Sequence, residues 1–257
     1  MPILVALLFL FISCAPTFAS HPRVLFDQGH GQAFVIEKDA DLHLSKLART
    51  FVDQGFEVSS TSHPLTADLL DKTDALVISG AFKPFATSEI AEIHRFLERG
   101  GRLAVMIHIG SPVLSLLDRL GVDVANRVIR EEQEVIANDP LNFRTSRLQP
   151  HSITLGLKNF SLYGSWPVRP ITASGEILAY TSARSWVDLS GDNHQTPGDV
   201  IQAFGVLVGN RIARGEVLVF GDDAIFQNRF LHGSNQDLAN NLGQWFGAGK
   251  GQVGQED

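Results

Sequence analysis

The chain has 257 residues, is 44% hydrophobic and carries a formal net charge of −7. A chain of this length can bury a substantial core, so we expect one α/β domain of moderate size, with or without an appended subdomain. The acidic balance argues against a nucleic-acid partner, because phosphate binding requires a basic face.

The N-terminus begins with an unbroken apolar run, PILVALLFLFI, over residues 2–12. Such a run is short for a transmembrane helix and typical of a signal-peptide core. Two alternative processing signals follow this run. TFA at residues 17–19 offers small residues at the positions that a signal peptidase reads and predicts that residues 1–19 are removed, whereas FISC at residues 11–14 resembles a lipobox with Cys14 as the lipidated residue. We expect an exported protein, periplasmic or secreted, whose membrane contact, if any, is a lipid anchor on Cys14.

Cys14 is the only cysteine of the chain. The exported part therefore has no intramolecular disulfide, no cysteine-based zinc site and no thiol nucleophile.

Residues 23–121 alternate predicted strands and helices. The strands are RVLF (23–26), FEVSS (56–60), ALVISG (75–80) and RLAVMIHI (102–109), and the helices lie at 39–55, 66–73, 87–101 and 111–121. The apolar residues of the helices recur at intervals of three and four, and ALVISG is continuously apolar, as in a strand covered on both faces. This order predicts a parallel sheet with right-handed crossovers. We expect a flavodoxin-like three-layer α/β sandwich with a mostly parallel sheet.

Residues 122–200 are less regular and mix short apolar runs with Pro, Asn and Ser, which predicts an irregular β-rich insertion. A hairpin turning within 209–215 then leads into a last core strand, EVLVFG (216–221), and a closing helix over 234–247. We interpret residues 20–247 as a single domain and residues 248–257 as a disordered tail.

Ligands of open α/β sheets bind beyond the carboxyl ends of the strands. The residues predicted there, a tentative binding cleft, are Asp27, His30, Gly31, Gly80, His108, Ser111, Asp222, Asp223 and Asn228.

Two kinds of chemistry are open at this edge, metal binding and nucleophilic catalysis. Asp27, His30 and Asp222, with His108 and Asp223 nearby, supply oxygen and imidazole ligands that suit zinc or manganese, although no diagnostic spacing is present. Ser111 follows a strand as a nucleophile would, but without G-x-S-x-G, and Ser-Pro is also a common helix start. The alternative is that these residues cap turns and pack in the core. We predict no cofactor.

Two further features lie in the irregular region. Asp188, Ser190 and Asp192 have the first spacings of a calcium loop, but Asn193 replaces its glycine and Asp199 its final glutamate. We favour a solvated loop. Trp166, Trp186, Phe160 and Tyr163 could line a glycan or peptide groove, but a role in the core is the stronger expectation.

The motifs VLFDQGHGQ (24–32), DALVISG (74–80) and GDDAIFQN (221–228) resemble the class I glutamine-amidotransferase-like domains. The resemblance covers about residues 22–247. It is closest to exported or membrane-anchored members of that superfamily, which are related to auxiliary domains of gliding-motility-type ABC transporters and to the N-terminal domain of an intraflagellar-transport protein. The resemblance implies a flavodoxin-like fold and a cysteine nucleophile at an elbow after a central strand. The matching segment here, IHIGSP (107–112), has no cysteine, so glutamine hydrolysis is not expected.

We therefore expect a non-catalytic binding or accessory domain of the cell envelope, associated with an ABC-type transport or surface-assembly system. Its partner would be an envelope protein or a small ligand. The alternative is an envelope hydrolase, with or without a metal, that uses Asp27, His30 and Asp222. Fold alone does not decide between them.

Overall fold

The computed structural model describes residues 21–248. The predicted signal peptide, Cys14 and the predicted tail beyond residue 248 lie outside the described residues. Within 21–248, no helix is both long and apolar enough to cross a membrane.

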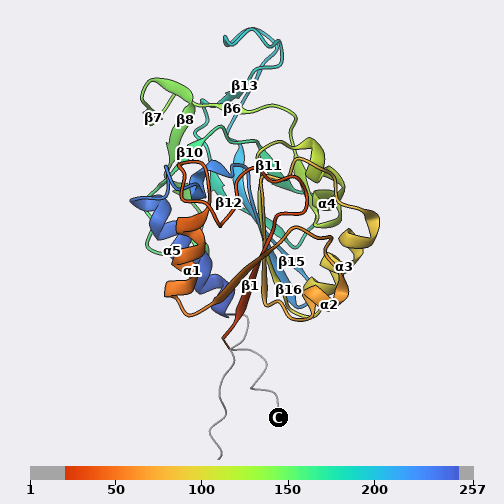
Figure 1. The fold of residues 1–257 in the computed structure, drawn as a ribbon. Helices are drawn as coiled ribbons and strands as arrows, with labels where there is room; N and C mark the ends of the chain where they lie inside the picture. Colours follow the sequence, from red (N-terminus) through yellow and green to blue (C-terminus); the bar gives the residue numbers. More distant parts are fainter. Residues whose placement is uncertain (1–20, 249–257) are drawn as a thin grey trace, which may run out of the picture.

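A mixed sheet runs through the centre of the molecule (Figure 1). The described residues place eight strands in it, in the order β2-β1-β3-β4-β16-β15-β12-β9. The five parallel strands are β1 (Arg23–Asp27), β2 (Glu57–Thr61), β3 (Ala75–Ser79), β4 (Arg102–Met106) and β16 (Gly215–Phe220). The antiparallel extension comprises β15 (Gly205–Ile212), β12 (Gly175–Tyr180) and β9 (Arg147–Leu148). The predicted flavodoxin-like, mostly parallel architecture is confirmed.

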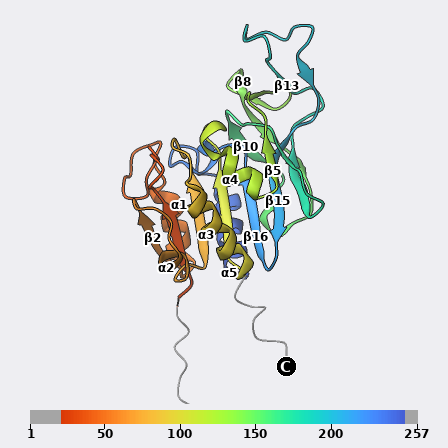
Figure 2. The same ribbon diagram turned by 90° about the vertical axis from the view of Figure 1, so that its right-hand side faces the viewer.

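Helices cover both faces of this sheet, as the two views show (Figures 1 and 2). One face carries α1 (Ser45–Asp53) and α5 (Ser234–Ala248), and the other carries α2 (Ala67–Leu70), α3 (Thr87–Glu98) and α4 (Leu114–Arg119). Alternation along each strand feeds both cores. On β3, for example, Val77 faces the α1–α5 side and Ile78 faces the other. Two hydrophobic cores, one on each side of the sheet, hold the three layers together.

The irregular region is less separate than the sequence indicates, because β9 and β12 join the main sheet. Its other strands form small sheets at the upper end of the molecule, from which the 188–199 loop projects (Figure 1). These strands are β5 (Val122–Val124), β6 (Ile129–Arg130), β7 (Val135–Ile136), β8 (Asp139–Thr145), β10 (Phe160–Tyr163), β11 (Val168–Pro170), β13 (Trp186–Val187) and β14 (Val200–Ile201).

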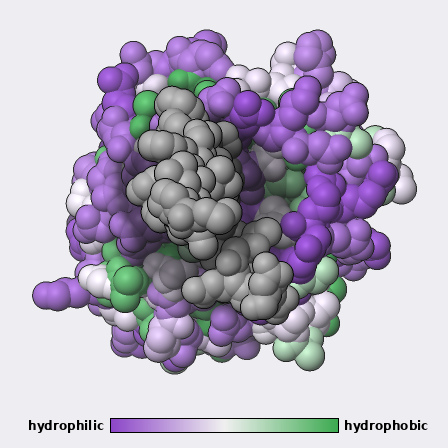
Figure 3. Space-filling view, turned by 90° about the horizontal axis from the view of Figure 1, so that it is seen from below, coloured by the Kyte–Doolittle hydropathy of each residue, from purple (hydrophilic) through white to green (hydrophobic). Residues whose placement is uncertain are grey.

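The end of the molecule where β1 begins carries mainly hydrophilic side chains, with hydrophobic residues only in scattered groups (Figure 3). The opposite end, where the parallel strands finish, collects the polar residues that the sequence singles out. The fold therefore directs attention to the carboxyl edge of the sheet.

The predicted helix at 39–55 begins too early. Residues 39–44 form turns, and α1 starts at Ser45. The backbone N–H of Lys46, near the start of this helix, donates to Asn228 Oδ1 at 2.9 Å. This contact satisfies one of the free donors that every helix N-terminus presents. The cap comes from a residue 182 positions away, so local sequence could not reveal it.

Candidate functional site

The loop after β1 lies where the order of the strands reverses. The chain passes from β1 to β2 on one side and returns to β3 on the other side of β1. The β1/β3 boundary is therefore the topological switch point, at which doubly wound sheets bind their ligands. Asp27 ends β1 and Ser79 ends β3, so the loops that follow them both begin at this boundary.

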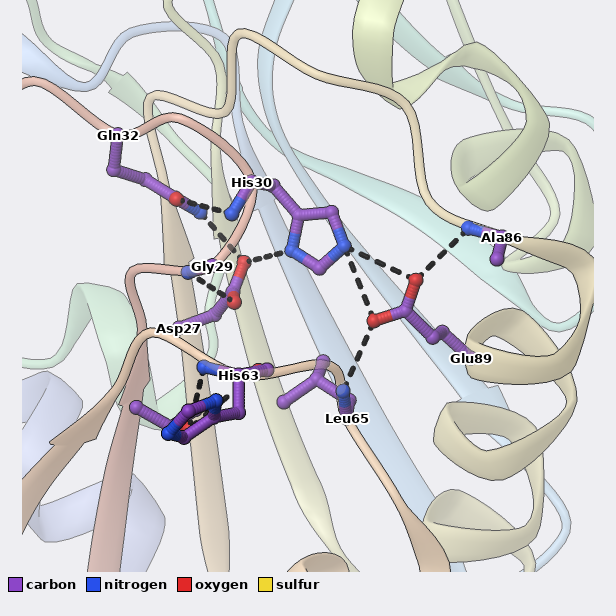
Figure 4. A network of polar contacts seen from close by, with 9 residues as sticks. Asp27, Gly29, His30, Gln32, His63, Leu65, Ala86 and Glu89 are labelled. Carbon is purple, nitrogen blue, oxygen red and sulfur yellow. Dashed lines mark hydrogen bonds and ion pairs between the residues drawn. The ribbon is translucent and has the colours of Figure 1, made fainter.

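His30 is held between two carboxylates at this edge (Figure 4). Its Nδ1 lies 2.8 Å from Asp27 Oδ2, and its Nε2 lies 3.3 and 3.2 Å from the two carboxylate oxygens of Glu89. Gln32 completes the group, because its amide donates to Asp27 Oδ2 at 2.6 Å and its Oε1 accepts the His30 backbone N–H at 2.7 Å. We call Asp27, His30, Gln32 and Glu89 the His30 clamp.

Glu89 links the His30 clamp to two further loops. Its carboxylate accepts the backbone N–H of Leu65 at 2.9 Å and that of Ala86 at 3.0 Å, the second from the residue that precedes α3. A glutamate in the first helical turn commonly folds back in this way, and the positive end of the helix dipole favours its charge. One carboxylate therefore joins the β2–α2 loop, the start of α3 and His30.

The His30 clamp is buried and charged. His30 is 5% exposed, and its imidazole stacks on Phe85 with ring centroids 3.7 Å apart. Burial lowers the pKa of His30, but the hydrogen bonds and negative charges of Asp27 and Glu89 outweigh it and raise the pKa above its usual value. Burial raises the pKa of Glu89, whereas the N–H groups of Ala86 and Leu65 and the imidazole bring it below its usual value. The geometry suits an imidazolium between two carboxylates.

This arrangement leaves His30 without a free ring nitrogen. A metal ligand must offer a nitrogen lone pair, and a general base must be able to accept a proton on one. Here Nδ1 faces Asp27 and Nε2 faces Glu89. The His30 clamp is therefore suited to holding loops together rather than to chemistry on a ligand.

A second histidine–aspartate pair lies at the ends of β4 and β16. His108 Nδ1 is 3.1 Å from Asp223 Oδ1, and 37% of the His108 side chain is exposed. The rings of Phe34 and Phe82 lie 5.3 and 5.0 Å from the imidazole, and Phe82 is itself 40% exposed. Gly80 packs against Asp223. We call His108, Asp223, Phe34, Phe82 and Gly80 the His108 site. The hydrogen bond that the imidazole donates to Asp223 is the main cause that raises the pKa of His108, against the opposing effect of burial.

One carboxylate oxygen of Asp223 lacks a hydrogen-bond partner among the described residues. Its Oδ2 is buried and has no hydrogen-bond partner within the described part of the chain. A Cβ placed on Gly80, whose φ is +62°, would lie 2.8 Å from this oxygen. Gly80 is therefore required twice, for its left-handed backbone and for the space beside Asp223. A buried carboxylate oxygen that lacks a hydrogen-bond partner destabilises the fold.

Asp222 does not join Asp27 and His30. Its carboxylate accepts the backbone N–H groups of Tyr163 and Ala224, and its pKa rises to about 7 because of burial and the adjacent charge of Asp223. Among residues 21–248, no cluster of three histidine, cysteine, aspartate or glutamate side chains could hold a metal ion. A metal held by Asp27, His30 and Asp222 therefore has no support, because Asp27 and His30 bond each other whereas Asp222 bonds the backbone of Tyr163 and Ala224.

Three other residues of the predicted cleft, Asn228, Gly31 and Ser111, make no contact with the described residues that points to a ligand. The amide of Asn228 fixes the residue 38–46 segment through Ala40, Ser45 and Lys46. Gly31 supplies a turn with φ +74° beside the Lys83 stem. Ser111 is exposed at the start of a one-turn 3₁₀ helix, and no described histidine or carboxylate bonds its hydroxyl. A nucleophilic role for Ser111 therefore has no support.

The acidic loop uses its carboxylates on its own backbone. Asp188 accepts the N–H groups of Gly191 and Asn193, and Asp199 accepts those of Leu189 and Thr196. These are turn-forming bonds, so the loop gives no support for calcium.

The middle aromatic residues mostly pack inside the protein. Phe160 and Trp186 are buried, and Trp166 donates its indole N–H to the His108 carbonyl at 2.8 Å. Tyr163 stacks on Phe230 at 3.9 Å. The expectation that these aromatics serve the core agrees with their packing.

Sequence reasoning missed Glu89, Gln32 and Phe34. Glu89 lies 59 residues from His30 and reads as an ordinary first-turn glutamate. Gln32 stands inside the motif already noted, at the i+2 spacing from His30 that side-chain-to-backbone bonds use. Nothing in the sequence near Phe34 indicates that it belongs to the site, because its neighbour His108 follows a different strand, β4.

The fold and the position of these groups define a flavodoxin-like α/β protein with polar clusters at the carboxyl edge of its sheet. The sequence profile of the family described as domain of unknown function DUF4350 matches residues 44–242. The chain belongs to this family. A comparison with curated proteins finds no match.

Solved structures share the fold at low sequence identity. The mmIFT52 N-terminal domain is 15% identical and aligns over 90% of this chain and 99% of that one with a TM-score of 0.70. A protein described as ThuA-like from Bacteroides uniformis, 15% identical, aligns over 90% and 94% with a TM-score of 0.54. Cytoplasmic protein STM1381 from Salmonella typhimurium, 14% identical, aligns over 87% and 99% with a TM-score of 0.56. At these identities the likeness establishes the fold alone.

Proposed function

We propose that the protein is a non-catalytic binding domain of the cell envelope that contacts an envelope partner through the His108 site. The observation that carries the proposal is the saturation of His30. Both of its ring nitrogens are engaged by carboxylates, so the polar loop at the switch point has no group free to act on a substrate. Catalytic histidines, in contrast, keep one nitrogen for the reacting proton.

The His108 site has the properties of a contact surface. It is the more open of the two clusters, with a half-buried histidine and an exposed phenylalanine at the ligand-binding edge of the fold. Exposed aromatic side chains of this kind often anchor protein partners. The unpaired oxygen of Asp223 lies directly behind them.

The proposed cellular location and the proposed link to a transport system both rest on the sequence. The N-terminal apolar run supports export, and the resemblance to amidotransferase-like auxiliary domains supports work beside an ABC-type transport or surface-assembly system. The segment after β4, where that superfamily has its cysteine, contains none. No observation favours the hydrolase alternative, because Asp27 and His30 bond each other whereas the carboxylate of Asp222 accepts the N–H groups of Tyr163 and Ala224.

Photo-crosslinking in the producing cells tests the proposal. A photoreactive amino acid replaces Phe82 and, as a matched control, the exposed Val52 on α1. We expect a defined envelope protein to crosslink from position 82 but not from position 52, and His108→Ala to abolish the crosslink. Identical patterns from the two positions would contradict the proposal. So would stoichiometric zinc or manganese in the purified protein that Asp27→Ala or His30→Ala removes.

A further inference from the structure

Two loops build both clusters. The loop after β1 carries His30 and, four residues later, Phe34. The loop between β3 and α3 carries Phe82 and Phe85. Phe85 stacks on His30, whereas Phe34 and Phe82 flank His108. The walls of the His108 site therefore belong to the segments that the His30 clamp holds.

His30 joins these loops through its backbone as well as its ring. Its carbonyl oxygen accepts the N–H groups of Phe82 and Lys83, each at 2.9 Å. Its ring ties Asp27 at the end of β1 to Glu89 on α3. A change in the position of His30 must therefore change the position of Phe82, the exposed wall of the site.

We infer that His30 is a positioning residue for the His108 site, and that its protonation regulates the binding surface. The inference rests on the proposed function, because it describes the control of that same surface. His30 itself touches no ligand. It acts by fixing Phe34 and Phe82 beside His108.

The charges around the imidazole give the direction of the effect. When both nitrogens carry protons, each donates to a carboxylate. After one proton is lost, a nitrogen lone pair faces a carboxylate oxygen, and the contact becomes repulsive. The other charged or titratable groups nearby are Lys83, whose stem lies over Gly31, and His63, whose backbone carbonyl lies beside Gly29. Both are exposed. Rising pH should therefore loosen the two loops.

Amide hydrogen exchange, resolved by residue and corrected for intrinsic rates, tests the inference on the whole exported chain. The reporters are the N–H groups of Phe82 and Lys83, which bond the His30 carbonyl. We expect their protection to fall about tenfold between pH 6 and pH 9, a change of about 1.4 kcal/mol in the free energy of opening the loops. In His30→Gln, which cannot change its charge, protection should be lower than in wild type at pH 6 and independent of pH.

Two variants keep the test interpretable. His94→Gln is the matched control, because His94 also pairs with a glutamate on α3 (Glu98, 3.2 Å) but lies away from the clamp. It should retain the wild-type pH dependence. Glu89→Gln removes the charge and keeps one acceptor oxygen, for one of the two N–H groups that the carboxylate binds, so it should weaken the pH dependence even if His30→Gln folds poorly. Protection that is independent of pH in the wild type, or a wild-type profile in His30→Gln, overturns the inference.

The crosslink from position 82 separates this inference from the proposed function. If the crosslink forms equally at pH 6 and pH 9 and survives in His30→Gln, binding stands and the regulation by His30 is overturned. If the loops loosen with pH but no partner crosslinks, the positioning of Phe82 by His30 stands as measured, whereas the proposed function, and with it the control of a binding surface, fails.

Discussion

Two histidine–aspartate pairs occupy the same edge of the sheet and differ in what else they touch. His30 meets Asp27 on one nitrogen and Glu89 on the other, and is almost fully buried. Among the described residues, the imidazole of His108 hydrogen-bonds only Asp223, and more than a third of the side chain is exposed. The first pair is closed off inside the protein, whereas the second is partly open to the surface. The same residue types at the same edge of the sheet therefore have different environments, which differ in burial and in the number of side-chain hydrogen bonds to the imidazole.

The largest expected effect comes from breaking the closed pair. Glu89→Ala removes the acceptor for Leu65 and Ala86 and leaves the His30 cation without its second carboxylate. Loss of one partner of a buried charged network costs about 3–5 kcal/mol. Urea unfolding at pH 6 measures it.

Glu98→Ala on the same helix is the control, since that side chain is half exposed and pairs only with His94. It should change the free energy of unfolding by less than about 1 kcal/mol. Equal losses for the two variants would show that the His30 clamp contributes no more than a surface pair.

The acid beneath the open pair should set a pH dependence of stability. Asp222 has a pKa near 7 in the folded protein, against 3.8 as its ordinary value. The folded state therefore holds a proton that the unfolded state releases, so stability falls as pH rises from about 4 to about 7. The loss from this residue is on the order of 4 kcal/mol. Urea unfolding at several pH values should show this slope in the wild type.

Asp222→Asn remains uncharged, so the free energy of unfolding of this variant should not fall with rising pH below pH 6. At higher pH, His30 adds a separate loss of stability. Its raised pKa contributes stability that is complete below 6.5 and is lost as pH rises through the folded value. An unchanged slope in Asp222→Asn would show that Asp222 is not its source.

A smaller effect is expected at Gly80, which lies behind the open pair. Gly80→Ala places a methyl group 2.8 Å from Asp223 Oδ2 on a residue with φ +62°. We expect a loss of about 2–3 kcal/mol from strain and steric conflict.

Gly156→Ala offers a matched control for the backbone term. Gly156 also has a left-handed φ, +73°, but nothing lies within 4 Å of its added Cβ. It should cost only about 1 kcal/mol, and thermal unfolding measures both. A Gly80→Ala variant no less stable than Gly156→Ala would indicate that Asp223 is free to move aside.

The smallest effect should come from the open histidine itself. His108→Gln should change the free energy of unfolding by less than about 1 kcal/mol, because a half-exposed pair contributes little. His30→Gln should cost clearly more in the same experiment. If His108→Gln were the more destabilising, the roles assigned to the two pairs would be reversed.

The sequence predicts the parts of the fold that local patterns determine. The continuous apolar run of β3 and the spacing of Leu238, Leu242 and Trp245 on α5 are enough to identify a central strand and a closing helix. The predicted start of α1 is wrong, since its cap is Asn228 from the opposite end of the chain. Residues 122–204 are harder to predict for the same reason, because their two- and three-residue strands depend on distant partners.

The candidate site shows the same limit. The sequence places Asp27, His30, His108 and Asp223 at the carboxyl edge, because strand ends can be recognised locally. It does not show which of them meet. The contact of His30 with Glu89 and that of Asp222 with Tyr163 decide the roles of these residues, and both join segments 59 residues apart.

Nitrogen-15 NMR of the two imidazole rings across pH 5–9 tests most directly whether His30 is a closed structural contact. We predict that His30 remains protonated on both nitrogens above pH 6.5 and that its ring protons exchange slowly with water, whereas those of His108 exchange rapidly. A neutral His30 at pH 7 with a free, solvent-exchanging nitrogen would contradict this role and make His30 a catalytic or metal-binding candidate again.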